Sequence, residues 1–447
     1  MYNLRTLIKY EYKKLLQRKS VWIVTLTLML LTSVSVALPP FMTTVSIDDK
    51  FNYTSYEEDT TQRALAADLA GQPIDDSLLQ EMNAVLSLEL YAALPEGERE
   101  PLPEEILDSL PTDLRSRLPE NVETVQPEDL TASPDSDVPY SAKYDDIDYF
   151  VDDSGAGSLA DVETAYLSDV PLYTDGSDHL YNLRRDTNEM IWEAHNLTDD
   201  EKAYLSDQED SLSTPYIYEY CGSYKSILSN AVILTIMISF LTAICIPPVS
   251  ADEHSRRTDQ VILCTRFGRR PAFLAKIITA ASFAMCAVLL LFASAAVPSF
   301  LIYGTEGFQA QIQVSLPGCS WDLTKGQAVL ILTGISLAAA VLLSCAALLL
   351  AEIFKSSIPA AGILIGLLLI SSFLNIPEQF RLLSQIWSYC PAKLISVTGS
   401  LLEPRLVPFF GTYLASWQFG PFLYLLLSVF FALGGYHIYR RWQAGGR

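Results

Sequence analysis

Six long apolar runs constrain this chain more than any other feature of its sequence. Each provides the roughly 20 residues that a helix needs to cross the hydrocarbon core of a bilayer. We therefore predict an all-α polytopic membrane protein with six transmembrane helices. The third run is longer than a crossing requires, so we expect its helix to tilt or to project beyond the bilayer. The runs lie near residues 21–41, 226–248, 272–302, 328–351, 356–375 and 418–439.

The negative charge of the chain belongs almost entirely to one segment. The formal net charge is −22, but residues 44–224 alone hold 43 acidic and 9 basic side chains. The remainder of the chain is therefore basic. We expect a largely helical acidic extracytoplasmic domain at 44–224, between transmembrane helices at 21–43 and 225–248.

Short basic segments predict which side of the membrane faces the cytoplasm. They precede the first run and follow the second, fourth and sixth, so six crossings place all of them on one side. Both termini should then be cytoplasmic, together with a loop at 249–271 and a tail at 440–447. Residues 272–439 supply the third to sixth helices, with an external segment at 376–416.

The N-terminal residues 1–20 show a helical pattern of apolar and basic side chains. An amphipathic helix of this kind is suited to lie along the inner membrane surface. The alternative is the basic region of a cleavable secretory signal, with Ser35-Val36-Ala37 near its cleavage site. The apolar positions are Leu4, Leu7, Ile8, Tyr12, Leu15 and Leu16.

The acidic segment has two helical ends and a repetitive middle. Helix-forming residues with apolar spacing occupy 56–93 and 178–212. Between them, prolines recur at a strict period of eight within residues 94–127. Each unit can form one short helical turn, because proline is tolerated at the first helical position and acids favour the first turn. Two interpretations stay open: a semi-rigid spacer or a disordered linker. Residues 131–160 read as a loop.

The sequence contains no convincing catalytic, phosphate-binding or metal-binding motif. No GxxxxGK[ST] phosphate loop occurs, and LTKGQ at 323–327 resembles an ATPase signature only by coincidence. The four histidines are isolated, and the acids of DDIDYFVDDSG do not have the spacing of an EF-hand loop. A Cys319–Cys390 disulfide is compatible with the topology, although sequence cannot assign pairing. We therefore expect a protein that is not an enzyme and holds no metal or cofactor.

Ionisable residues are missing from the central turns of all six runs. Proton- and sodium-driven carriers use such residues to couple transport to a gradient. Their absence indicates that any transport draws its energy from elsewhere.

The predicted loop at 249–271, SADEHSRRTDQVILCTRFGRR with its flanking residues, is the most specific feature. An acidic pair and a basic pair are followed by a polar turn, a short apolar run and a second basic cluster. The arginines account for topology, but Ile262, Leu263 and Phe267 have the spacing of one helical face. An apolar face in a cytoplasmic loop predicts a protein partner.

The order of residues in this loop resembles the segment after the second crossing in ABC type 2 exporter permeases. The family pattern has two departures here, since Arg257 stands where Gly is frequent and Arg266 where Pro is frequent. The surface helix, the six crossings and an external re-entrant segment at 376–416 are similar to the family as well. The matching positions are Glu253, Thr258, Asp259, Val261, Ile262, Leu263, Gly268, Arg269 and Lys276.

The resemblance implies a permease subunit in a bacterial plasma membrane, working with a separate cytoplasmic ABC ATPase that holds the ATP and Mg²⁺. A second permease copy or a related permease would complete the pathway through the lipid bilayer, and no nucleic acid is involved. We expect the loop and the N-terminal helix to dock on the ATPase. The expected coupling residues are Glu253, Arg256, Arg257, Thr258, Asp259, Ile262, Leu263, Phe267, Arg269 and Arg270.

Two other functions compete with this prediction. An ATPase-linked sensor or mechanotransmitter would use the acidic external domain to bind a peptide or an envelope component, and the size of that domain favours it. A gradient-driven carrier or channel is the third alternative, and the uncharged centres of the apolar runs argue against it.

Overall fold

The computed structural model describes residues 2–42, 44–48, 51–54, 70–75, 102–103, 124–125, 177–256, 258–265, 268, 270–316, 318–377 and 380–441. This part of the chain is mostly helical, as predicted. The sequence did not predict its three two-stranded pairings: β1 (Thr44–Asp48) with β2 (Phe51–Thr54), β3 (Leu102–Pro103) with β4 (Thr124–Val125), and β5 (Val407–Phe409) with β6 (Thr412–Leu414).

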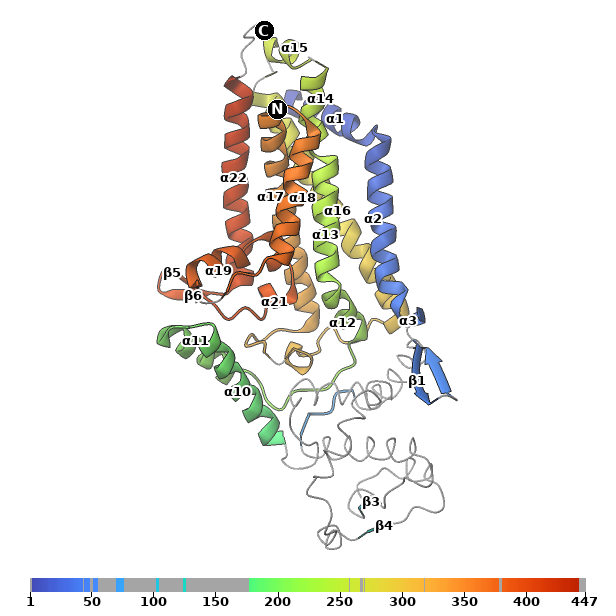
Figure 1. Cartoon of the computed structure of the whole chain (residues 1–447), viewed down its shortest axis with the longest axis vertical. Coiled ribbons are helices and arrows are strands. Elements are labelled where there is room, and N and C mark those ends of the chain that lie inside the picture. Colours follow the sequence, from blue (N-terminus) through green and yellow to red (C-terminus); the bar gives the residue numbers. More distant parts are fainter. Residues whose placement is uncertain are drawn as a thin grey trace.

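Long helices run side by side to form the main bundle (Figure 1). Five spans in the described residues are long and apolar enough to cross a membrane, which indicates a multi-pass membrane protein. Helix α18 (Ser357–Phe373) is apolar but shorter, at 17 residues, so the sixth crossing stays a prediction. The five spans are α2 (Lys19–Ala37), α13 (Ala231–Cys245) continued by α14 (Pro247–Ser255), α16 (Arg270–Tyr303), α17 (Lys325–Phe354) and α22 (Ser416–Arg441).

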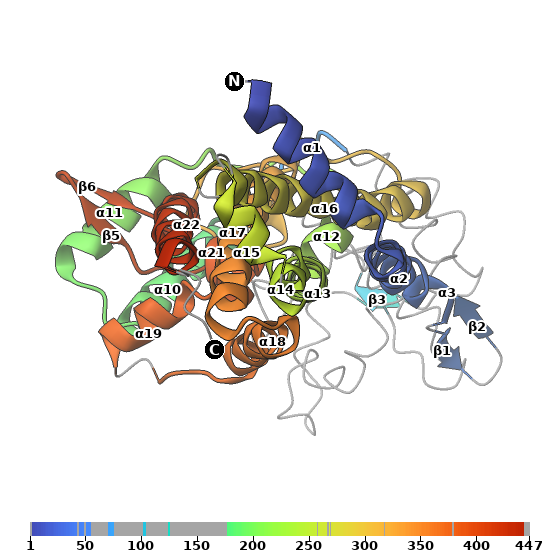
Figure 2. The same cartoon turned by 90° about the horizontal axis from the view of Figure 1, so that it is seen from above.

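Helix α1 (Tyr2–Leu16) and the C-terminal end of α22 lie at the same end of the bundle, together with α14 and α15 (Asp259–Cys264) (Figure 1). We call this the terminal end. Seen from above, α1 lies across the bundle rather than along it, as expected of a surface helix (Figure 2). The opposite end, which carries α10 (Ser177–Ala194), α11 (Asp199–Asp210) and α12 (Gly222–Ser229), is called the insert end.

Small side chains allow α16 and α17 to pack closely in the bundle core. Ala284 on α16 and Ala340 and Ala347 on α17 are completely buried. Small residues suit helix contacts in a bilayer because they let backbones approach closely. Helix α16 has 34 residues and is therefore about 50 Å long at 1.5 Å per residue. This exceeds a hydrocarbon core of about 30 Å, as its apolar run predicted.

The second predicted transmembrane helix, at 225–248, is longer and more segmented in the structure. It begins in α12 and runs through α13 into α14, which ends only at Ser255. Pro247 and Pro248 stand in the first turn of α14, where a missing backbone N–H costs little. The predicted loop at 249–271 is correspondingly shorter, and its first residues belong to the bundle.

The predicted external segment at 376–416 folds into short helices and a hairpin. The hairpin, β5–β6, turns at Phe410 and Gly411, which both have positive φ angles. The sequence carried no alternating pattern long enough to predict it. The helices are α19 (Arg381–Ser388), α20 (Pro391–Leu394) and α21 (Val397–Ser400).

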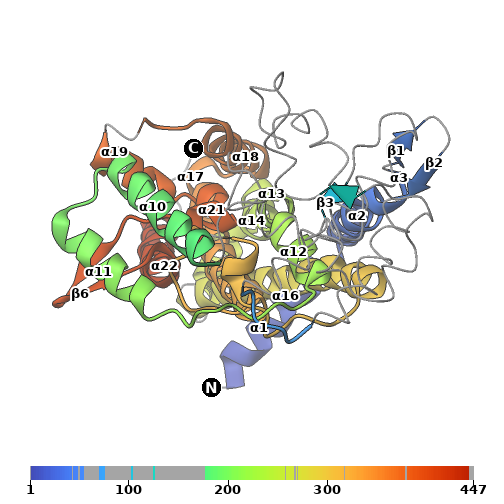
Figure 3. The ribbon, with the colours of Figure 1, turned by 90° about the horizontal axis from the view of Figure 1, so that it is seen from below.

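The predicted helix at 178–212 is divided into α10 and α11. The break follows from a capping box, in which Thr198 and Glu201 satisfy each other's backbone N–H groups at the start of α11. Figure 3 shows both helices across the insert end, beside α19 and α22. Trp192 and Leu205 anchor them in a buried apolar cluster shared with Leu394 of α20.

Several predictions for the acidic segment lie wholly or almost wholly outside the described residues. These are the helix at 56–93, the octad repeat at 94–127, the loop at 131–160 and the acids of DDIDYFVDDSG. The Cys319–Cys390 disulfide that the topology allowed is not formed, since both residues are free cysteines. Cys319 is completely buried at the insert end.

An ion pair adds a polar contact between α11 and α19. Arg381 donates to both carboxylate oxygens of Glu201, at 2.7 and 2.6 Å, and to the carbonyl oxygen of Asn196 at 2.7 Å. Burial alone raises the pKa of Glu201. The hydrogen bonds from Thr198 and Arg381 more than offset this effect, so the pKa lies below its usual value of 4.5.

Acid should therefore loosen α11 from the bundle. A lowered carboxylate pKa contributes stability above the usual value of 4.5, and this contribution is lost as the pH falls through the lower folded-state value. Hydrogen exchange of α11 amides should accelerate over this range, whereas Glu201→Gln should accelerate it already at neutral pH. Glu189→Gln, an exposed change on α10, is the matched control. Unchanged α11 exchange in Glu201→Gln would refute the assignment.

Candidate functional site

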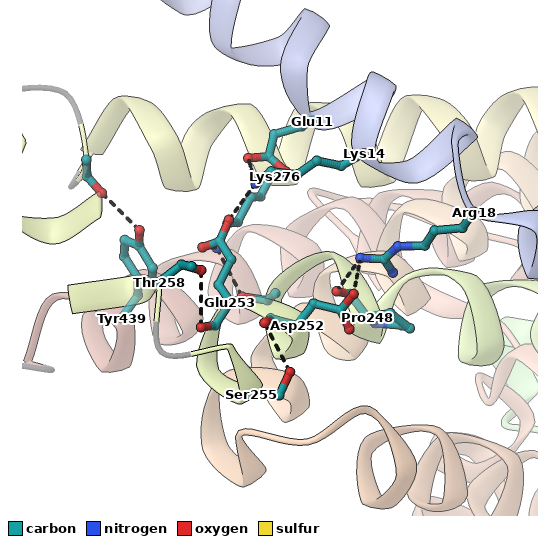
Figure 4. A network of polar contacts seen from close by, with 12 residues as sticks. Glu11, Lys14, Arg18, Pro248, Asp252, Glu253, Ser255, Thr258, Lys276 and Tyr439 are labelled. Carbon is teal, nitrogen blue, oxygen red and sulfur yellow. Dashed lines mark hydrogen bonds and ion pairs between the residues drawn. The ribbon is translucent and has the colours of Figure 1, made fainter. Parts of the chain in front are cut away.

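The carboxylate of Glu253, near the end of α14, points into the bundle instead of toward solvent. The residue is 6% exposed. Its Oε2 accepts a hydrogen bond from Lys276 Nζ of α16 at 2.6 Å, and its Oε1 accepts one from Lys14 Nζ of α1 at 2.7 Å. Figure 4 shows the carboxylate between the two ammonium groups. One side chain therefore joins three helices at the terminal end.

The two lysines that hold Glu253 differ in exposure. Lys276 is 1% exposed, and its Nζ also lies 4.9 Å from the ring centre of Tyr439. Lys14 is nearly half exposed and also pairs with Glu11 at 2.9 Å. Burial lowers the pKa of Lys14, but Glu253 and Glu11 together more than offset this, so the pKa lies above 10.5. Lys14 therefore stays charged at every physiological pH.

A second buried carboxylate extends the network to α17. Glu352 accepts hydrogen bonds from Ser250 and, at 2.9 Å, interacts with Nε2 of His254. Lys276 Nζ also donates to Ser250 Oγ at 3.3 Å, which links the two carboxylate clusters. Helix α14 is thus fastened to α16 and α17 by polar side chains that are shielded from water.

Arg18, in the turn between α1 and α2, makes a separate contact with α14. Its Nη2 donates to Asp252 Oδ2 at 2.9 Å and to the carbonyl oxygen of Pro248 at 2.8 Å (Figure 4). Together with Lys14, this arginine holds the surface helix at two points along α14.

The segment after α14 folds back on itself and on α22. Thr258 donates through its backbone N–H to the carbonyl oxygen of Glu253 at 3.0 Å. Gly268 approaches the carbonyl oxygen of Ile262 so closely that a Cβ there would lie 1.6 Å from it. The carbonyl oxygen of Gly268 accepts a hydrogen bond from the buried Tyr439 hydroxyl at 2.9 Å. These contacts place α15 on the outer surface of the terminal end (Figure 2).

The structure separates the predicted coupling residues into different environments. Glu253 is a buried anchor, because two lysines and the surrounding helices enclose it. Arg256 and Thr258 are exposed, while Ile262 is partly buried. Arg270 is exposed and donates to the Tyr436 hydroxyl at 3.0 Å. The side chains of Asp259 and Leu263 on α15, and the residues Arg257, Phe267 and Arg269, lie outside what the structure describes.

Of the apolar face predicted for the loop, Ile262, Leu263 and Phe267, the structure describes the side chain of Ile262 alone. Val261 is 70% exposed, whereas Ile262 turns partly inward. The short helix α15 therefore offers Val261 and Cys264 to solvent beside the exposed Arg256. This exposed set, Arg256, Val261 and Cys264, is called the α15 surface below.

Sequence reasoning missed the partners of Glu253 and the cluster at Glu352. The available signal was weak: Lys14 lies on the polar side of a surface helix, and Glu352 directly follows an apolar run. Charged residues at such positions ordinarily face water or lipid headgroups. Only the packing of α14 against three other helices brings them together.

In the part of the chain that the structure describes, no group of three or more His, Cys, Asp or Glu residues could hold a metal. A pocket of about 220 Å³ at the insert end is lined by residues of α10, α11 and the following segment. Its arginines are already paired, Arg184 with Glu209 and Arg185 with Asp210.

Comparison of the chain with protein-family models, with curated proteins and with solved structures found no match in any of the three. The geometry of the terminal end therefore carries the functional argument alone.

Removal of the Glu253 charge should destabilise the bundle strongly. Glu253→Gln leaves Lys276 buried without its counter-ion, and breaking a buried pair typically costs about 3–5 kcal/mol. The double variant Glu253→Met with Lys276→Met should recover most of that loss, since it removes both buried charges. Thermal unfolding of the detergent-solubilised chain measures both effects. Equal losses in the single and double variants would show that Lys276 does not depend on Glu253.

Proposed function

We propose that this chain is the membrane subunit of an ATP-driven exporter and that a separate cytoplasmic ATPase docks on the α15 surface. The observation that carries the proposal is the combination of an exposed short helix with a buried charge network directly beneath it. An exposed apolar side chain next to an arginine suits a protein contact. A network of buried ion pairs suits the transmission of force.

Movement of the α15 surface would reach the long helices through α14. Glu253 connects α14 to α16 and α1, while Ser250 and His254 connect it to α17 through Glu352. Closure of an ATPase against α15 would therefore move several helices together. Two arrangements of these helices, biased by nucleotide on the partner, would constitute alternating states of a pathway.

The distribution of charge in the spans supports an external energy source. The ionisable residues of the long apolar helices lie toward their ends, as Lys276 and Glu352 do. Ion-coupled carriers place such groups along the transport route. An ATPase partner supplies the energy without them, and this chain has no phosphate-binding loop of its own.

Charge reversal on the α15 surface should weaken the association with the ATPase. Arg256→Glu is expected to reduce recovery of a nucleotide-hydrolysing partner about tenfold, equivalent to about 1.4 kcal/mol of binding free energy. Affinity purification of the full chain from native membranes, followed by an ATP hydrolysis assay, measures this recovery. Arg441→Glu, an exposed arginine at the end of α22, is the charge-matched control. Recovery of no ATPase with the unmodified chain would refute the proposed function.

The proposed orientation has a direct test through cysteine labelling. A variant that retains only Cys264, which is exposed on α15, should react with a membrane-impermeant maleimide only after cells are permeabilised. In the cysteine-free background, Asp200→Cys on the exposed side of α11 should react in intact cells. Labelling of Cys264 in intact cells would place the terminal end outside and exclude a cytoplasmic partner there.

A further inference from the structure

Lys325 is an unusual residue at the insert end. It is the first residue of α17, directly after the N-cap Thr324, and its side chain is 1% exposed. The N-terminus of a helix carries a partial positive charge, so a cation there is unfavourable. Burial of an ammonium group adds a further cost unless a partner compensates it. The position therefore requires an explanation.

The partner of the Lys325 ammonium is a sulfur atom. Among the residues that the structure describes, the polar partner of Lys325 Nζ is Sγ of Cys221, at 2.5 Å. Hydrogen bonds from N–H to oxygen span about 2.7–3.2 Å, and bonds to the larger sulfur atom are longer. The separation is therefore shorter than a hydrogen bond and longer than a direct bond between nitrogen and sulfur. It matches two atoms held on either side of one bridging atom.

The surrounding backbone keeps the two side chains together. Gly307, with φ of +86°, crosses Cys221 so closely that a Cβ would lie 2.7 Å from its Cα. The same loop continues to Ala310, whose carbonyl oxygen accepts the backbone N–H of Lys325 at 2.9 Å. Cys221 is itself only half-buried, so a small oxidant can reach its sulfur.

We propose that Lys325 and Cys221 form a redox-dependent covalent cross-link, in which a single oxygen atom bridges Nζ and Sγ and dioxygen is the oxidant. The amine, after giving one proton to solvent, and the thiol react with one O₂. One N–H and the S–H bond are replaced by N–O and O–S bonds, and one water molecule leaves. Nitrogen and sulfur lose two electrons each, and the four electrons reduce the two oxygen atoms.

The cross-link would connect two segments that are distant in the sequence. Cys221 is the N-cap of α12, which leads directly into α13, and Lys325 starts α17. Oxidation would therefore fasten the start of α17 to the segment before α13 at the insert end. Reduction by two equivalents of a dithiol returns the free amine, the free thiol and water. The inference depends on these two side chains alone and not on the proposed exporter function.

Peptide mass spectrometry of the full chain, purified in detergent under air and without reductant, tests the cross-link. The peptides that contain Cys221 and Lys325 should be recovered as one species, heavier than their sum by one oxygen less two hydrogens. Dithiothreitol should separate them, and chain kept under argon with reductant should yield the free peptides. Cys390→Ser, which changes another half-buried cysteine at the insert end, should leave the cross-linked species unchanged.

Two variants establish that both partners are needed. Lys325→Arg keeps the positive charge, and Cys221→Ser keeps a small polar group, yet each should abolish the cross-linked species. Recovery of Cys221 as a free thiol from aerobically purified chain, alkylated by iodoacetamide without prior reduction, would overturn the proposal. A disulfide of Cys221 with Cys319 or Cys390 would also overturn it. The unmodified chain gives this answer even if a variant fails to fold.

Discussion

A single carboxylate between two ammonium groups organises the terminal end of this protein. Glu253 accepts from Lys276 and Lys14, and these two contacts fix the positions of α1, α14 and α16 relative to one another. Burial of these charges costs free energy, because each loses its hydration, and the contacts with its partners must compensate for that loss. This need for partners also makes the arrangement specific, since a shift of α14 by one helical turn would leave several charges unpaired. The position of α15 above the network follows from that of α14.

Much of the membrane part was predictable because its signal is physical and local. A run of about 20 apolar residues has few stable alternatives to a transmembrane helix, and periodic leucines with lysines between them favour a surface helix. The ends of the helices were harder to predict. Helix α14 continues past Ile246 to Ser255 through polar residues, which read as a loop when taken singly. The polar groups of α14 are paired with Lys276, Arg18 and Glu352, which are far from α14 in the sequence.

The sequence singled out the loop after the second predicted crossing, but not the contacts that its residues make. The arginines and apolar residues of this loop predicted a protein partner. Arg256 is exposed in the structure. The sequence did not indicate whether the side chain of Glu253 faces inward or outward, and in the structure it faces inward. No pattern within the loop could distinguish these outcomes, because the lysines that capture Glu253 come from α1 and α16. The β5–β6 hairpin and the break between α10 and α11 depended in the same way on contacts or caps that a short apolar pattern does not reveal.

The spans differ greatly in how much protein surrounds them. Protein covers 17% of the most apolar stretch of α2, against 56% of that of α17. Lipid therefore meets most of the surface of α2, whereas other helices cover more than half of this stretch of α17. During synthesis α2 can enter the bilayer and remain there as an independent helix, long before the rest of the chain has emerged. The bundle then assembles around α17 as the last spans arrive, and α2 joins it through apolar side chains such as Val21 and Val36, which are buried in the main apolar cluster.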